Sequence, residues 1–149
     1  MFGKWLWMFG TGGSAYFLLE LLYRGHSHVS MFFAGGLSAA LIFLLCCGGK
    51  LRGAGWYVRC ALGSAIITAV EFFTGVFVNL YLQLHVWDYS SLPLNLLGQI
   101  CLPFSAFWFF LTLPILALGD LLNRAEGQSL LSKAARKRRN AVSPSSSGR

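Results

Sequence analysis

Charged side chains are scarce in this sequence. They make up 11% of the 149 residues, whereas a soluble domain has about 25%, so a fold solvated mainly by water is excluded. Acidic residues are the rarest, with 5 Asp and Glu against 12 Lys and Arg. Hydrophobic residues reach 56% and the mean hydropathy is +0.61. These values predict a protein embedded in a membrane.

Several sequence motifs of known chemistry are also absent. There is no GxxxxGK[ST] loop, so any ATP hydrolysis would need a separate subunit. The absence of HExxH and GxSxG excludes the familiar hydrolase routes. The four cysteines form no CxxC pair, and the HxH pair of His26 and His28 has no third ligand nearby. We therefore expect no metal and no cofactor, and we interpret the cysteines as small packing residues.

Four apolar stretches approach or exceed the ~20 residues that cross a bilayer as a helix. They cover residues 5–22, 29–47, 60–82 and 100–122. Within the second stretch, Gly35 with Ala39 and Gly36 with Ala40 form small-xxx-small pairs, which let helix backbones approach closely in lipid. The sequence thus predicts an all-α membrane protein with a domain of four transmembrane helices at residues 1–123.

Basic residues predict the orientation of this domain. With an even number of spans, both termini and the loop 48–59 share one side, which carries nearly all Lys and Arg; the loop 85–99 has none. By the positive-inside rule both termini are cytoplasmic. Residues 124–149 are predicted to be a flexible basic tail. Its cluster at 133–139 fits anionic membrane lipids or serves only as a topology signal, and nucleic acid is not a predicted partner.

Glu71 lies in the middle of the third apolar stretch. An ionised side chain there costs about 2.5–3.5 kcal/mol on insertion scales. Ser64, Thr68, Glu71, Gly75 and Asn79 follow at intervals of three or four residues and share one helical face, which we expect to point into the bundle. Glu71 either binds a proton, a cation or a polar substrate, or it clamps its helix to neighbours through hydrogen bonds.

Glu20 lies one turn before Arg24, at the i,i+4 spacing of an ion pair. Asp120 and Arg124 have the same spacing, and we interpret them too as an i,i+4 ion pair at the membrane interface. An alternative is that Glu20 joins Glu71 and Asp88 around an outward-facing negative cavity, which would favour cations or amines.

The polar loop between the third and fourth stretches could bind a ligand, because Trp87 and Tyr89 offer stacking surfaces while Asn95 and Gln99 offer hydrogen bonds. A simple turn stabilised by Asp88 is the other interpretation. The candidate ligand-binding residues are Glu20, Glu71, Asn79, Trp87, Asp88, Tyr89, Asn95 and Gln99.

These segments together resemble a known family. The runs Glu71-Phe72-Phe73-Thr74-Gly75 and Trp87-Asp88-Tyr89-Ser90, followed by Pro93, Asn95, Gly98, Ile100 and Cys101, are similar to small bacterial membrane proteins classed as type IV ABC-transporter permeases. The resemblance extends from the first apolar stretch to Asn123. It implies a permease-like transport component of the bacterial cytoplasmic membrane, with a separate ATPase subunit or self-association.

Two other functions fit the same residues. One is a small membrane enzyme that acts on a lipid-like substrate, with Glu71 or Asp88 as acid or base. The other is a structural or regulatory helix bundle that binds another membrane protein. We expect transport rather than catalysis, and the sequence does not identify the substrate.

Overall fold

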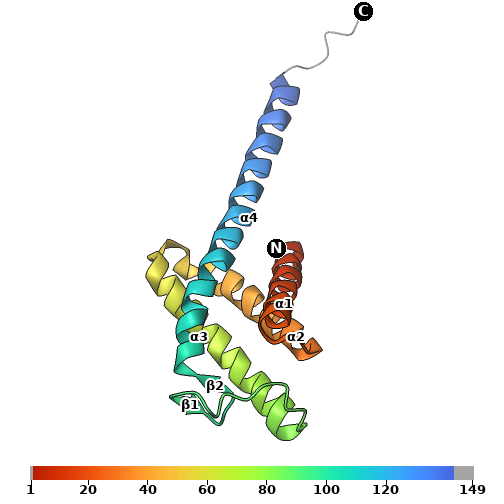
Figure 1. Cartoon of the computed structure of the whole chain (residues 1–149). Coiled ribbons are helices and arrows are strands. Elements are labelled where there is room, and N and C mark those ends of the chain that lie inside the picture. Colours follow the sequence, from red (N-terminus) through yellow and green to blue (C-terminus); the bar gives the residue numbers. More distant parts are fainter. Residues whose placement is uncertain (1, 143–149) are drawn as a thin grey trace, which may run out of the picture.

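The computed structural model describes residues 2–142 and is almost entirely helical (Figure 1). This confirms the all-α prediction. Two π-helical segments, η1 and η3, extend helices α2 and α3, and a short hairpin precedes α4. The order of elements is α1 (Phe2–Arg24), α2 (Val29–Ile42), η1 (Phe43–Cys47), η2 (Lys50–Gly53), α3 (Trp56–Gly75), η3 (Val76–Tyr81), β1 (Asn95–Leu96), β2 (Ile100–Cys101) and α4 (Leu102–Val142).

Helices α1 and α2 pack against each other through small residues. A Cβ atom at Gly12 would overlap the side chain of Ala39, and one at Gly35 would overlap Tyr16. The two backbones therefore approach more closely than larger side chains allow. The close approach expected at Gly35 and Ala39 is confirmed.

Three helices of the described residues are long and apolar enough to cross a membrane: Val29–Cys47, Trp56–Tyr81 and Leu102–Asn140. They correspond to the second, third and fourth predicted spans. Helix α1 has 23 residues, but its glycines and charged residues make it less apolar, and it is not among the three. Its role as a fourth span stays a prediction.

Helix α3 begins before its apolar stretch, at Trp56. Arg59, which the sequence places in the loop 48–59, therefore lies in the first turn of α3, and it is buried with 8% of its surface exposed. The predicted loop therefore extends too far, to residue 59. Arg59 can lie buried inside the helix because the carboxylate of Asp120, described below, compensates its charge.

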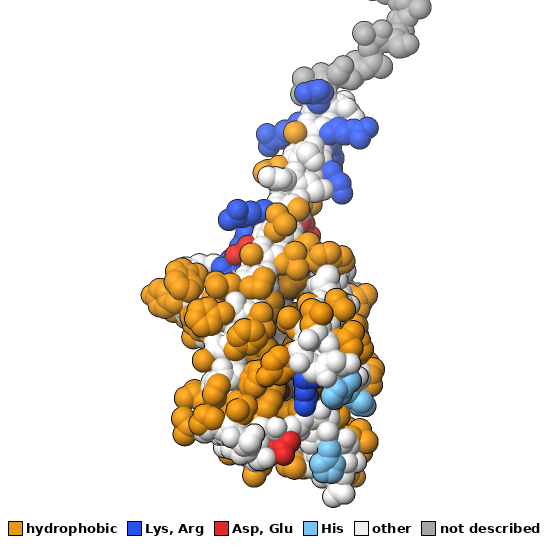
Figure 2. Space-filling model, in the orientation of Figure 1, with side chains coloured by type: hydrophobic (Ala, Val, Ile, Leu, Met, Phe, Trp, Pro, Cys, Tyr) orange, Lys and Arg blue, Asp and Glu red, His pale blue; other side chains and the backbone are white. Residues whose placement is uncertain are grey.

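Helix α4 continues past Asn123 to Val142, where the sequence predicts a flexible tail. The reason is local, because Ala, Leu, Arg, Lys and Glu are strong helix formers and fill most of this segment. The extension projects away from the other helices (Figure 1), and its Lys and Arg side chains contrast with the hydrophobic face below it (Figure 2). Residues 143–149 of the predicted tail lie outside the described residues, and the division at residue 123 stays a prediction.

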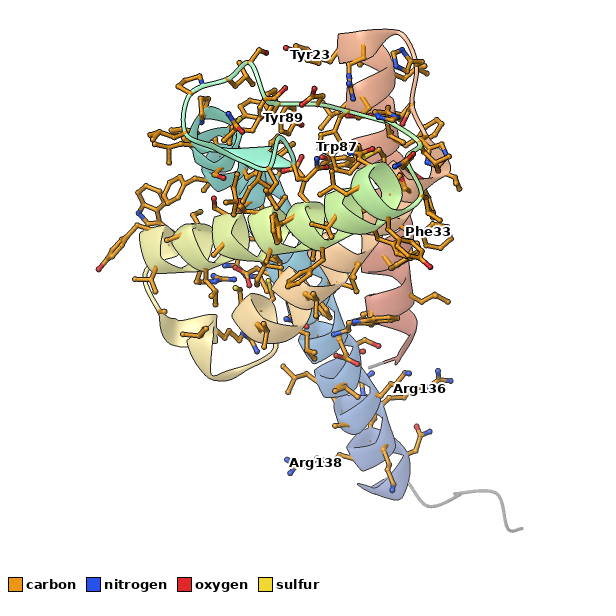
Figure 3. All side chains as sticks on the ribbon, turned by 90° about the horizontal axis from the view of Figure 1, so that it is seen from below. Tyr23, Phe33, Trp87, Tyr89, Arg136 and Arg138 are labelled. Carbon is orange, nitrogen blue, oxygen red and sulfur yellow. The ribbon has the colours of Figure 1, made fainter. Side chains whose placement is uncertain are left out.

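Residues 82–101 connect η3 to α4 and contain two short strands; we call this whole connection the hairpin. Strands β1 and β2 pair antiparallel, with Asn95 opposite Cys101 and Leu96 opposite Ile100. Trp87 and Tyr89 lie on the segment that runs back along α3 before the strands (Figure 3). The hairpin as a whole carries five of the eight candidate binding residues, namely Trp87, Asp88, Tyr89, Asn95 and Gln99, so its packing decides where the site lies.

Candidate functional site

The carboxylate of Glu71 is the centre of the site. Its Oε1 accepts hydrogen bonds from Tyr16 OH at 3.1 Å and from Tyr89 OH at 3.2 Å, and its Oε2 accepts one from Trp108 Nε1 at 2.8 Å. Only 3% of Glu71 is exposed. Three aromatic donors thus replace water around a buried acid, as a buried charge requires.

The three donors come from three different elements. Tyr16 lies on α1, Tyr89 on the hairpin and Trp108 on α4, while Glu71 itself lies on α3. Their rings also pack together, with the Tyr16 and Trp108 centroids 5.5 Å apart. Glu71 therefore joins every long part of the membrane domain except α2, and any movement of α1, α4 or the hairpin changes its hydrogen bonds.

A second buried network attaches the hairpin to the end of α3. Asn79 Nδ2 donates to Trp87 O at 3.0 Å and to Gln99 Oε1 at 2.8 Å, and its Oδ1 accepts from Val86 N at 2.7 Å. Trp87 Nε1 donates to Gln99 O at 3.0 Å. Asn79, Trp87 and Gln99 are all buried. This network fixes the hairpin and so holds Tyr89 against Glu71.

The hairpin approaches α3 closely at Gly75. A Cβ atom there would lie 2.6 Å from Gln99 Oε1 and 2.9 Å from Trp87 Cζ2, so a larger residue would displace the hairpin. The hairpin tip is also strained, because Leu94 and Leu97 adopt positive φ values of 53°, which cost a non-glycine residue about 1–2 kcal/mol each. Backbone strain of this kind gathers at functional sites.

Asp88 and Asn95 lie outside this site. The exposed Asp88 carboxylate accepts from Ser90 N at 2.8 Å, and this bond lowers the pKa of Asp88 below its usual value. Asn95 Nδ2 donates to Leu92 O at 2.9 Å and to Ser90 O at 3.1 Å. Both side chains shape the turns of the hairpin, so the structure does not place Asp88 beside Glu71 and Glu20.

Glu20 forms the expected ion pair with Arg24, with 3.4 Å between Oε1 and Nη1. The pair lines a small cavity of about 70 Å³ together with aromatic side chains that include Tyr89. Glu71 does not line this cavity, so the carboxylates of Glu20 and Glu71 do not share it.

A second cavity, of about 270 Å³, lies between α1 and α4 and is bounded also by residues of α2 and α3. Its lining is almost entirely apolar. Tyr16, Leu19 and Trp108 line both cavities and form the wall between them. Because Tyr16 and Trp108 are also donors to Glu71, the buried acid holds two of the three residues of this wall.

A separate polar cluster lies at the other end of the helices. Arg59 forms a two-pronged pair with Asp120, with Nη2–Oδ1 at 2.9 Å and Nη1–Oδ2 at 3.0 Å, and its Nη2 also donates to Cys47 Sγ at 3.4 Å. The sequence pairs Asp120 with Arg124 instead, and this prediction was wrong. The bidentate geometry with Arg59 is the stronger interaction, since Arg124 is exposed.

Sequence reasoning identified Glu71, Asn79, Trp87, Tyr89 and Gln99 but missed Tyr16 and Trp108. One signal pointed to the two missing residues. Tyr and Trp usually lie at the membrane interfaces, whereas these two lie in the middle of apolar stretches, where their polar groups need a partner.

Among residues 2–142, the His, Cys, Asp and Glu side chains form no group of three or more that could hold a metal ion. The four cysteines are free and buried.

Comparison with known proteins identifies the class of the chain. A family profile described as "Putative ABC-transporter type IV" matches residues 1–135. The chain belongs to this family. No curated protein and no solved structure matches it. The family description suggests an ABC-transporter component, for which an ATPase is a possible partner.

Proposed function

We propose that this chain is a permease-like subunit of a transport system in the bacterial cytoplasmic membrane. Family membership and three long apolar helices support a membrane transport role. The observation that carries the proposal is the wall of Tyr16, Leu19 and Trp108 between two cavities. A substrate that moves from one cavity to the other has to displace this wall.

Glu71 would hold the wall closed through its hydrogen bonds. Its hydrogen bonds from Tyr16 and Trp108 hold α1 and α4 in the closed arrangement. Opening would remove donors from a carboxylate in a medium of low dielectric, which is costly. A proton or a donor group of the substrate would compensate this cost. Opening of the wall would then be coupled to protonation of Glu71 or to binding of the substrate.

The hairpin would face the outside and the α4 extension the cytoplasm. The hairpin loop has no Lys or Arg, whereas the extension is rich in both. Because the sequence lacks a nucleotide-binding loop, the energy would come from a separate ATPase that docks on the loop 48–59 or on the extension. Self-association would complete the translocation path, since the four predicted spans of one chain are too few to enclose it.

The test compares Glu71→Gln with Asp88→Asn, a change at an exposed acid outside the site that keeps the Oδ1 acceptor for Ser90 N. The glutamine side chain in Glu71→Gln is isosteric with the native one and can turn its oxygen toward Trp108 while the tyrosine hydroxyls accept from its amide, so folding is retained. The chain is purified from native membranes with its ATPase, and ATP hydrolysis is measured together with the solute and lipid content of the cells. We expect Glu71→Gln to reproduce the deletion phenotype and Asp88→Asn to behave as wild type.

The outcomes separate the three functions. If no ATPase co-purifies and deletion changes no solute, the transport proposal fails. An enzyme would instead leave a lipid species that accumulates in the Glu71→Gln strain, although Glu71 lines neither cavity. A structural bundle would show loss of stability in Glu71→Gln without any separate transport effect.

A further inference from the structure

The cavity between α1 and α4, called the channel below, runs along both helices. It is lined on α1 from Met8 to Leu19 and on α4 from Trp108 to Leu118. At a rise of 1.5 Å per residue this is a length of roughly 16 Å. Half of the ~30 Å hydrocarbon core of a bilayer has about the same length, so one extended acyl chain matches the length of the channel.

The chemistry of the lining agrees with such a chain. Four lining residues carry polar side-chain groups, and three of them are bonded elsewhere: Tyr16 and Trp108 donate to Glu71, and Thr11 Oγ1 donates to Trp7 O at 2.9 Å. Ser38 is the fourth, and it is buried. The favourable term for an occupant is thus burial of apolar surface.

The two ends of the channel differ. At the end of Leu19 and Trp108, these wall residues separate the channel from the small cavity of Glu20 and Arg24. At the end of Met8 and Leu118 no charged residue belongs to the lining. A ligand with one charged end and one apolar end matches this polarity.

We propose that the channel binds the acyl chain of a membrane phospholipid whose polar head lies at the Leu19 and Trp108 end, next to the wall that separates it from Glu20 and Arg24. The inference deepens the proposed function by naming an amphiphilic lipid as the class of substrate. The inference rests on the proposed transport function only in calling the lipid a substrate. The site itself follows from the length and apolar lining of the channel and from the charged pair beyond the wall at its Leu19 end.

The test uses the full chain in vesicles of phosphatidylethanolamine and phosphatidylglycerol with two photoreactive phosphatidylethanolamine probes. One probe has a diazirine near the head group and the other has it at the chain end. We expect the first to modify the Leu19 end of the channel and the second to modify the Leu118 end. Peptide mass spectrometry locates the adducts.

Two tryptophan substitutions on α4 provide the matched pair. Ile115 lines the channel, whereas Leu113 is 40% exposed on another face. Each buried methylene contributes several-fold to affinity, so filling the channel with Ile115→Trp should lower labelling by about tenfold. Leu113→Trp should leave it unchanged. Ala15→Phe, at the exposed rim, gives a second block if Ile115→Trp does not fold.

Equal labelling of the channel and of outward-facing residues would overturn the proposal. So would labelling without order along the channel, or adducts to a partner protein in native membranes in place of lipid. If the channel is labelled as expected while Glu71→Gln leaves transport unchanged, the lipid site stands and the proposed transport function fails.

Discussion

Trp108 on α4 donates its indole N–H to Glu71 Oε2 on α3 at 2.8 Å, across 37 positions of the sequence. It is the shortest of the three bonds to this carboxylate and the only one to its Oε2 in the described residues. Tyr16 and Tyr89 share the other oxygen. The three donors are therefore not equivalent, and Trp108 is the one whose loss leaves an oxygen without a partner.

Trp108→Phe should destabilise the protein more than Tyr89→Phe. Removing the indole leaves a buried carboxylate oxygen unpaired, which costs about 2–3 kcal/mol. Tyr89→Phe removes one of two donors to Oε1 and should cost about 1 kcal/mol. The free energy of unfolding is measured in detergent by thermal or denaturant titration. Trp7→Phe is the control, since Trp7 is 50% exposed, and a cost equal to that of Trp108→Phe would contradict the role of the bond.

The part of this site that lies on one helix could be predicted from the sequence. Glu71, Gly75 and Asn79 recur at helical spacing, and the structure buries all three. The donors Tyr16 and Trp108 could not be paired with Glu71, because helical periodicity says nothing about which distant helix lies opposite. Of the two interpretations of Asp88, the local bond from Ser90 N supports the simple turn, and such a bond competes with a distant role beside Glu71.

Asp120→Ala should be costly, whereas Arg124→Ala should not. Asp120 compensates the buried guanidinium of Arg59, and removing one partner of such a pair leaves an uncompensated charge. Because the Asp120 side chain is 30% exposed, we expect about 2 kcal/mol, below the 3–5 kcal/mol of fully buried pairs. Arg124 is exposed, so its change should stay within about 0.5 kcal/mol. Unfolding of the two variants is compared directly, and equal costs would favour the i,i+4 pair.

Gly75→Ala should loosen the hairpin. The new methyl group would overlap Gln99 Oε1 and Trp87, and overpacking of this kind costs about 1–3 kcal/mol. Hydrogen exchange of residues 86–99 should rise, because the hairpin loses its contact with α3. Gly10→Ala is the control, since nothing lies within 4 Å of a Cβ atom there and helix propensity favours Ala by up to about 1 kcal/mol. Unchanged exchange in Gly75→Ala would show that the hairpin is not held at this position.

The start of α1 contacts α4 where the basic extension begins. Lys4 on α1 donates to Asn123 Oδ1 at 3.0 Å and forms an ion pair with Glu126. This contact lowers the pKa of Glu126, and it places the start of α1 beside the root of the basic extension. If α4 spans the membrane with its extension in the cytoplasm, the start of α1 lies on the cytoplasmic side as well.

Single cysteines at Gly3, Ser91 and Ser129 test this arrangement with a membrane-impermeant maleimide. The four native cysteines are buried, so the wild-type chain serves as the background control. Ser91→Cys, on the hairpin, should react in intact cells, because a loop without Lys or Arg is exported. Gly3→Cys and Ser129→Cys should react only after the membrane is opened. If Gly3→Cys reacted from outside while Ser129→Cys did not, α1 would lie outside the bilayer and the four-span prediction would be wrong.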